Sequence, residues 1–249
     1  MDTILTDEER ERYSRHLRLS EIGEQGQMLL RQARVLVVGA GGLGSPVLQY
    51  LAAAGVGTLG VVDGDKVDVS NLQRQVIHTT QAVGESKTAS ASRFIRALNP
   101  HVEVNEYPFF LTPDNVDSVF AGYDLVVDCT DNFSARFLVN DACVRLGKPF
   151  VHGSISQFQG QLFTHLPGTA CYRCIFPDEP QPSREPVAGP LGVLPGVIGS
   201  LQAAEVVKYI THAGSLHTDA LLLFDALSMS FMRLQVRRSA SCAVCASVQ

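Results

Sequence analysis

Gly39, Gly41 and Gly44 have the spacing G-x-G-x-x-G and directly follow the apolar run at 35–38. In this pattern a strand turns tightly into a helix, and the N–H groups at the start of the helix can face a phosphate. Asp63 ends the next apolar run, where a carboxylate can accept hydrogen bonds from ribose hydroxyls. Because these features suit NAD and ATP equally, they predict a nucleotide site without naming the nucleotide.

Three charged residues behind the glycines favour ATP. Arg74 lies in the polar segment 70–75, Lys87 begins the next expected helix, and Asp131 follows the apolar run that ends at Asp128. A triphosphate needs positioned cations, and a carboxylate at the carboxyl end of a parallel strand is a suitable Mg²⁺ ligand. Each residue alone also fits an ordinary role, as a surface charge, a solvated first-turn residue or a helix N-cap. Together behind one glycine loop they predict ATP with Mg²⁺.

Cys171, Cys174, Cys242 and Cys245 form two C-x-x-C pairs. Four thiolates complete the tetrahedral shell of Zn²⁺ and leave no position for water. The pairs therefore predict a structural zinc site that takes no part in the chemistry. Their long separation weakens the pattern, and four small buried residues are the alternative.

Three other residues whose side chains could take part in a reaction are expected to be structural. Cys129 falls inside a buried strand and Cys143 within a helix that packs on the sheet, so both are expected in the core. The seven histidines show no ligand spacing. His152 is expected to be packed or at a sheet edge rather than to act as a base.

The elements that position these residues alternate between strands and helices over most of the chain. Buried apolar runs and amphipathic segments predict strands at 33–39, 58–65, 101–107, 123–132 and 148–155, with helices at 45–55, 85–100, 113–120 and 133–147. Thr6 and Glu9 form a capping box that opens an earlier polar helix. This alternation predicts an α/β fold with a Rossmann-like, doubly wound and mostly parallel sheet.

The later part of the chain changes character. Alternating segments predict antiparallel strands at 160–166, 220–227 and 230–238 around a helix at 199–213, and a loop with six prolines spans 177–196. We expect one domain over 1–249, with an N-terminal helical arm at 1–30 and a nucleotide-binding part at 31–155. The remaining part, 156–249, carries the long loop, the antiparallel extension and the zinc knuckle.

Charge and hydropathy exclude several classes of protein. The net charge of −5 argues against a nucleic-acid surface, which needs clustered Lys and Arg. Residues 35–62 are uncharged and long enough to span a bilayer, but seven glycines and Pro46 favour a buried strand–helix–strand unit over a membrane span. The acidic start lacks the apolar segment of a signal peptide, so we expect a cytoplasmic protein with reduced cysteines.

Several motifs together resemble the HesA/MoeB/ThiF family of ubiquitin-activating-enzyme-like adenylyltransferases. The similarity covers nearly the whole chain in order, through GAGGLGS, VVDGDKVDVSNLQRQ, VGESKTASA, DLVVDCTDN, CYRC, GVIGSLQAAEVVKYI and CAVC. The resemblance implies a homodimer that uses ATP with Mg²⁺ to adenylate the C-terminal glycine carboxylate of a β-grasp sulfur-carrier protein ending in Gly-Gly. Pyrophosphate is released, and a sulfurtransferase or cysteine desulfurase then supplies sulfur for molybdenum cofactor or thiamine biosynthesis. Residues 156–249 would be the carrier-binding part, with 177–196 as its crossover loop.

The resemblance also implies roles for single residues. Arg15, Arg74, Lys87 and Asp131 would be catalytic, with Arg15 reaching the phosphates held by the neighbouring subunit. Without the resemblance, Arg15 fits an ordinary exposed charge on a polar helix. The nucleotide would be bound by Gly39, Gly41, Gly42, Gly44, Asp63, Asp65, Ser70, Asn71, Leu72, Gln73, Arg74, Lys87, Asp131 and Asn132.

Two features leave alternatives open. Some relatives carry a cysteine in the long loop, but this loop has none, which counts against a covalent thioester or persulfide and leaves the pathway unassigned. The glycine turn also fits an NAD(P)- or flavin-dependent oxidoreductase, and the fold fits a non-catalytic scaffold. The charged residues behind the glycines and the cysteine pairs favour the adenylyltransferase.

Overall fold

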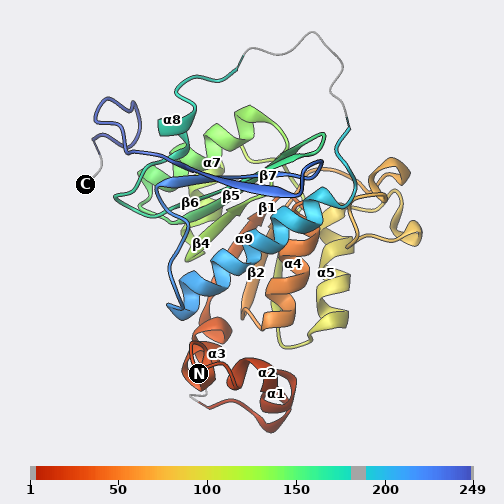
Figure 1. The fold of residues 1–249 in the computed structure, drawn as a ribbon. Helices are drawn as coiled ribbons and strands as arrows, with labels where there is room; N and C mark the ends of the chain where they lie inside the picture. The colour runs from red at the N-terminus through yellow and green to blue at the C-terminus, as the bar shows by residue number, and fades with distance from the viewer. Residues whose placement is uncertain (1–3, 181–188, 248–249) are drawn as a thin grey trace.

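The computed structural model describes residues 4–180 and 189–247 and contains one eight-stranded sheet of order β3-β2-β1-β4-β5-β6-β7-β8 (Figure 1). The first five strands in this order are parallel: β3 Glu103–Tyr107, β2 Thr58–Val62, β1 Arg34–Val38, β4 Leu125–Asp128 and β5 Phe150–Ser156. The last three are antiparallel: β6 Gln159–His165, β7 Ala220–Asp225 and β8 Ser230–Gln235. The predicted parallel sheet with an antiparallel extension is confirmed.

Helices cover both faces of the parallel strands, as a doubly wound sheet requires. One face packs against α4 (Gly44–Ala54), α5 (Lys87–Leu98) and α9 (Leu194–Thr211). The other face packs against α6 (Val116–Ala121), α7 (Phe133–Arg145) and the short α8 (Tyr172–Ile175). The chain changes sides between β3 and β4, so β1 and β4 lie together at the switch point where ligands bind in this architecture.

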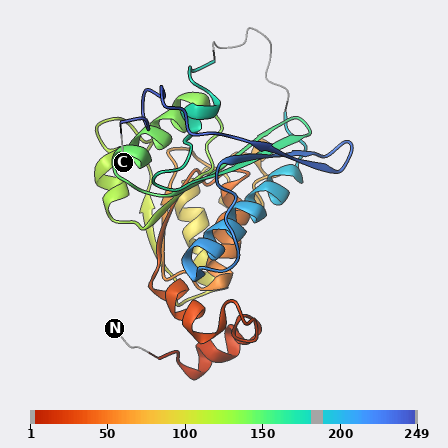
Figure 2. The same cartoon turned by 60° about the vertical axis from the view of Figure 1, so that its left-hand side comes forward.

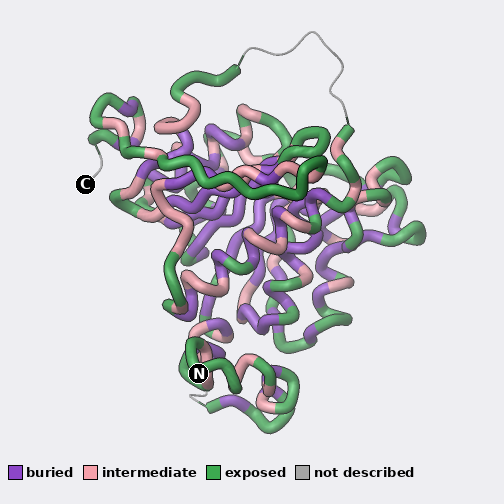
Figure 3. The backbone as a smooth tube through the Cα atoms, in the orientation of Figure 1, coloured by how far each residue is buried: buried purple, intermediate pink, exposed green. Residues whose placement is uncertain are grey.

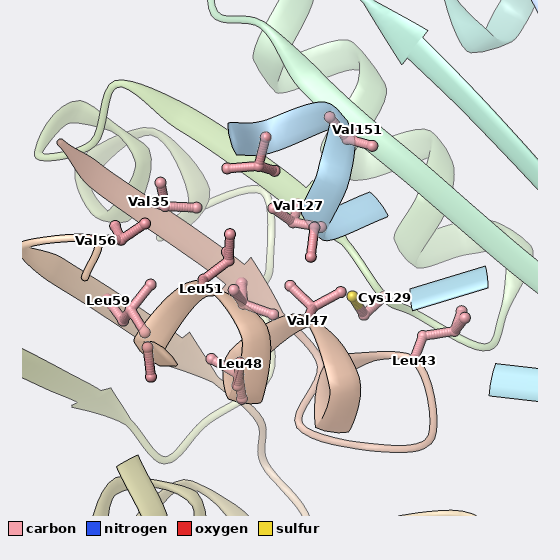
Figure 4. Packing of buried hydrophobic residues seen from close by; sticks show 14 of the residues in the cluster. Val35, Leu43, Val47, Leu48, Leu51, Val56, Leu59, Val127, Cys129 and Val151 are labelled. Carbon is pink, nitrogen blue, oxygen red and sulfur yellow. The ribbon is translucent and has the colours of Figure 1, made fainter. Parts of the chain in front are cut away.

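Alternation along the strands builds the two cores. Val35 and Val37 of β1 face α4 and α9, whereas Leu36 and Val38 face α6 and α7. Figure 4 shows Val47, Leu48 and Leu51 of α4 packed between the strands and α9. The uncharged stretch 35–62 is therefore a buried strand–helix–strand unit, as predicted. No helix in the described ranges combines the length and the hydropathy that a membrane crossing requires.

Two glycines of the first loop are needed for the strand-to-helix turn. Gly39 has φ +99°, which favours glycine, and a Cβ on Gly44 would lie 1.9 Å from the Gly39 carbonyl oxygen. Gly44 therefore allows the helix to begin directly against the turn. This is the close helix–strand packing expected of the third glycine in the fingerprint.

Helix α9 begins at Leu194, five residues earlier than predicted. The predicted loop 177–196 was wrong at this end, because Pro195 occupies the first turn of a helix and does not belong to a loop. Gly199 lies inside the helix, where a Cβ would sit 2.4 Å from Cγ of Pro46 and 2.6 Å from the Leu43 carbonyl oxygen. The glycine is there to let α9 pack closely on α4, which the sequence pattern does not reveal.

The N-terminal arm lies below the amino ends of the parallel strands and projects from the body of the molecule (Figure 2). It comprises α1 (Asp7–Arg12), α2 (Ser14–Leu17) and α3 (Gly23–Gln32), whereas the sequence analysis named a single helix within the helical arm that it placed at 1–30. The predicted capping box between Thr6 and Glu9 is present in both directions. Tyr13 anchors the arm, since its hydroxyl oxygen accepts a 2.8 Å hydrogen bond from Asn99 after α5.

Candidate functional site

A cleft of about 760 Å³ opens at the carboxyl ends of β1, β2 and β4. It is lined by nine of the residues that the sequence assigned to nucleotide binding or catalysis: Gly39, Gly41, Gly42, Asp63, Asp65, Arg74, Lys87, Asp131 and Asn132. Five other assigned residues of the nucleotide set, Gly44, Ser70, Asn71, Leu72 and Gln73, lie outside this lining. Arg15 also lies outside the cleft, exposed on α2 of the N-terminal arm. The cleft volume suits a single nucleotide.

Asp63 is held at the end of β2 by two backbone N–H groups. Its Oδ2 accepts a 2.8 Å hydrogen bond from Ala40 in the glycine loop, and its Oδ1 accepts one of the same length from Asp65. The carboxylate therefore ties the loop after β2 to the loop after β1. Asp63 lines the cleft, and its carboxylate retains lone pairs to which ribose hydroxyls can donate.

Lys87 is buried at the first position of α5 and pairs with Asp65, with 2.8 Å between Nζ and Oδ2. The ordinary alternative for Lys87, a solvated first-turn residue, is therefore contradicted by its burial. Arg74 lies in the loop before α5, and its guanidinium donates to the Ser70 carbonyl oxygen at 3.1 Å. Both cations line the same cleft, so they can neutralise phosphate charge together.

Asp131 projects into the cleft from the end of β4, and its side chain is exposed. The N-cap of α7 is Asn132, whose Oδ1 accepts a 2.9 Å hydrogen bond from the N–H of Ala135. Asn132, and not Asp131, therefore caps the helix, so the ordinary role considered for Asp131 does not apply. Its carboxylate oxygens remain available to a hard cation, which fits the predicted Mg²⁺ site.

His78 is a site residue that the sequence analysis missed. It is buried behind the glycine loop, where its Nε2 lies 2.8 Å from the Ala40 carbonyl oxygen and its Nδ1 lies 2.9 Å from Ser90 Oγ. Burial lowers the pKa of His78, so the neutral ring donates to the carbonyl and accepts from the hydroxyl. No ligand spacing in the sequence marks this residue.

Asp128 and His152 form a second polar pair beneath the cleft. They are register partners on β4 and β5, both almost fully buried, with 2.7 Å between Asp128 Oδ2 and His152 Nδ1. Burial acts to raise the pKa of Asp128, but the hydrogen bonds from His152 and Thr130 prevail and hold it below its usual value. The expectation that His152 is packed is confirmed, whereas its bond to Asp128 was not foreseen.

The side of the cleft beyond β3 is aromatic. Phe109 and Phe110 line it, and the Phe110 ring lies so close to Gly64 that a Cβ there would approach the ring to within 2.6 Å. Phe110 is 63% exposed, although it is a large apolar side chain. Because the order of strands runs from β4 through β1 and β2 to β3, a nucleotide whose phosphates lay at Asp131 and whose ribose lay at Asp63 would direct its base toward Phe110.

The four predicted zinc ligands come together at a second site. Their sulfurs all lie within 4.8 Å of one another, with 3.7 Å between Cys171 and Cys242 and 3.5 Å between Cys174 and Cys245. A tetrahedral shell with Zn–S bonds of about 2.3 Å places neighbouring sulfurs about 3.8 Å apart. The donor set therefore fits Zn²⁺, and four sulfur ligands leave no open position for catalysis.

Two thiols of this cluster have pKa values that are shifted in opposite directions. Burial and the three neighbouring thiols raise the pKa of Cys171, because ionisation without a cation is unfavourable there. At Cys242 burial opposes ionisation, but the backbone N–H groups of Cys245 and Val244 prevail and lower the pKa to about 7. A divalent cation held by these four sulfurs would stabilise the thiolates and join the C-terminal segment to α8.

Known proteins resemble this chain over most of its length. The ThiF family matches residues 13–244. A sulfur carrier protein adenylyltransferase of Thermus thermophilus is 53% identical over an alignment of 249 residues. The alignment covers 96% of this chain and 92% of that protein. The SAMP-activating enzyme E1 of Haloferax volcanii is 48% identical over 238 residues, which cover 94% of this chain and 88% of that protein.

Longer proteins are also similar. Adenylyltransferase and sulfurtransferase MOCS3 of Mus musculus is 49% identical over 239 residues, but the chain spans only 52% of its length. Among solved structures, E. coli MccB with ATP superposes with a TM-score of 0.84 at 26% identity, covering 95% of this chain and 75% of that one. A protein with this fold, E. coli MccB, has therefore been solved with ATP.

Proposed function

The chain belongs to the ThiF family, and we propose that it uses ATP to adenylate the C-terminal carboxylate of a small sulfur-carrier protein. The observation that carries the proposal is the cleft itself, in which a glycine loop, Arg74, Lys87 and Asp131 converge. Close relatives are named as adenylyltransferases or activating enzymes, and none of those described above is named as an oxidoreductase. The nicotinamide or flavin alternative is therefore not favoured.

The reaction needs positioned charge rather than a strong base. A C-terminal carboxylate is already ionised at neutral pH, so its oxygen can attack the α-phosphorus directly. The bond from the α-phosphorus to the oxygen bridging to the β-phosphorus breaks, and pyrophosphate leaves. Arg74 and Lys87 would neutralise the phosphate oxygens, and Asp63 would hold the ribose. Asp131 would hold Mg²⁺, which supplies further charge neutralisation when bound.

Residues 156–249 would bind the carrier. Leu227, Met229, Phe231 and Met232 of the β7–β8 hairpin are 55–73% exposed, and a β-grasp domain could cover such a surface. The described ends of the predicted crossover loop flank the cleft: Ser134 donates a hydrogen bond to the Glu179 side chain, and Gly189 and Pro190 line the cleft. A Gly-Gly tail would pass between these ends. The rest of that loop, 181–188, lies outside the described residues.

Sulfur would be supplied by a separate donor. Cys129, at the edge of the cleft, and Cys143 are both buried. Burial, followed by the charge of Asp128, raises the pKa of both thiols well above the usual value. Neither is suited to act as a nucleophile. The acyl-adenylate would then be attacked by the sulfur of a sulfurtransferase or cysteine desulfurase. Carriers of the molybdenum cofactor and thiamine pathways are the two candidates. We propose a cytoplasmic location, where the cysteines would remain reduced.

We also propose a homodimer in which Arg15 serves the neighbouring active site. Arg15 is exposed on α2 and absent from the cleft lining of its own chain, although the family resemblance assigns it to phosphate. An arginine supplied in trans stabilises developing phosphate charge in other phosphoryl transfers. The arm that bears it projects from the body, where a second copy could meet it (Figure 2).

Carrier-dependent ATP–pyrophosphate exchange tests the proposed function. Purified protein with Mg²⁺ should exchange labelled pyrophosphate into ATP only when a carrier ending in Gly-Gly is present. The same carrier without its terminal glycine is the matched control and should not support exchange. Tight binding of NADH without binding of ATP would overturn the proposal in favour of an oxidoreductase.

A further inference from the structure

The loop that carries Asp131 is held from below by a chain of hydrogen bonds. Asp128 Oδ1 accepts from both the N–H and the hydroxyl of Thr130, at 3.0 Å and 2.7 Å. Its other oxygen, Oδ2, accepts from His152 Nδ1 at 2.7 Å. Thr130 lines the cleft and is bonded directly to Asp131 in the chain. One carboxylate thus connects a histidine in the middle of β5 to the residue that would hold the metal.

His152 has one polar contact in the described part of the chain. Its Nε2 is buried and has no hydrogen-bond partner there, while its ring packs against Tyr172 with centroids 4.7 Å apart. The side chain of His152 is 0% exposed and that of Asp128 is 1% exposed, so bulk solvent does not reach this hydrogen bond. The imidazole therefore has a single polar function, which is to donate to Asp128.

We propose that His152 is a positioning residue for adenylyl transfer: through Asp128 and Thr130 it fixes the loop on which Asp131 presents its carboxylate. The inference rests on the proposed function. It assigns His152 no contact with substrate and no proton transfer. Without the donor on β5, the Asp128 carboxylate must find another partner, and the bonds that orient Thr130 change with it. The consequence should appear in the use of Mg²⁺ before it appears in the binding of the base or ribose.

Substitution of His152 tests this through the Mg²⁺ dependence of exchange. His152→Leu removes the donor at similar volume, and His152→Asn keeps an amide N–H near the position of Nδ1. The leucine variant should raise the Mg²⁺ concentration for half-maximal exchange about tenfold and lower kcat. The apparent affinity for ATP measured without Mg²⁺ should change less than about twofold. The asparagine variant should recover most of the loss.

A matched control separates positioning from general stability. His165 is also buried, on the next strand, and lies outside the lining of the cleft. Its Nδ1 lies 2.9 Å from the Ala170 carbonyl oxygen. His165→Leu should lower the melting temperature without changing the Mg²⁺ requirement. If His152→Leu behaves in the same way, with lower stability and an unchanged Mg²⁺ requirement, the inference is overturned.

A second variant breaks the series of hydrogen bonds without changing a residue of the sheet. Thr130→Val removes the hydroxyl that donates to Asp128 and should raise the Mg²⁺ requirement in the same direction. Combined with His152→Leu, its effect should be less than additive, because both changes break one chain. Full additivity would overturn the inference. If His152→Leu folds poorly, an unchanged Mg²⁺ requirement in Thr130→Val alone would overturn it. Failure of the wild-type protein to exchange at all would instead refute the proposed function.

Discussion

The parallel and antiparallel halves of the sheet differ in what covers them. β1 is buried from Val35 to Val38 and β4 along its whole length, with helices on both faces. Every residue of β8 is exposed, and Figure 3 shows this strand as an uncovered edge. The parallel half therefore holds its polar side chains in one internal cleft, whereas the antiparallel half presents apolar side chains outward. On the proposed function, the first half performs the chemistry and the second recognises the protein that is modified.

The largest effect expected in the parallel half comes from Asp131→Ala. Loss of the metal-holding carboxylate should reduce carrier-dependent exchange at least about a thousandfold while the fold remains intact, because several kcal/mol of transition-state stabilisation are lost. Asp114→Ala removes an exposed carboxylate on a neighbouring loop and serves as the control. Near-normal exchange by a folded Asp131→Ala protein would remove this residue from the mechanism.

The next largest effect tests whether one chain supplies all the residues of its own nucleotide site. Arg15→Ala should reduce exchange about a hundredfold if the arginine acts on the partner's phosphates, and Arg18→Ala on the same arm should not. Co-expression of Arg15→Ala with Asp131→Ala should restore roughly a quarter of the wild-type activity per site, because half of the random dimers are mixed and each holds one intact site. No recovery in proven mixed dimers would place Arg15 in its own site or outside any site.

A charge on the exposed strand tests the role of the antiparallel half. Met232→Asp should raise the KM for the carrier about tenfold and leave the affinity for ATP unchanged, because it places a charge in the proposed apolar interface. Leu98→Asp, at a partly exposed apolar position on α5, is the matched control. A carrier KM that is unaffected by Met232→Asp would mean that the carrier docks elsewhere.

Phe110→Ala probes the base end of the cleft. Loss of stacking against the base costs about 1–3 kcal/mol in other aromatic contacts with bases, so the affinity for ATP should fall about tenfold. Binding of inorganic tripolyphosphate should not change, because it has no base. Phe158→Ala, on the turn between β5 and β6 and outside the cleft lining, is the control. An equal loss of affinity for both ligands would indicate a general structural defect.

The zinc knuckle should affect stability more than chemistry. One zinc per chain should co-purify, and Cys174→Ser should lower the metal content and the melting temperature together. Exchange measured well below the melting temperature should stay within about threefold of the wild type. Metal-free protein with unchanged melting would show that the four sulfurs are only packed side chains.

Sequence reasoning succeeded where chemistry depends on local spacing. The glycine turn, the carboxylates Asp63 and Asp131 that follow β2 and β4, and the two C-x-x-C pairs are each defined within a few residues, so their types and distances along the chain were sufficient. It failed where a residue acts through a distant partner. His78 and Phe110 gain their places from packing against the loops after β1 and β2, and no local period records such contacts.

The sequence by itself determined the order of elements, the nucleotide loop, the cysteine pairs and the family. These follow from hydrophobic periodicity, turn-forming residues and short motifs, all of which are local properties of the chain. Only the tertiary structure decided that α9 starts at Leu194, that Asn132 caps α7 in place of Asp131, and that His152 supports Asp128 across 24 residues. These contacts depend on the register of strands and the close approach of helices, which arise when the whole sheet is assembled.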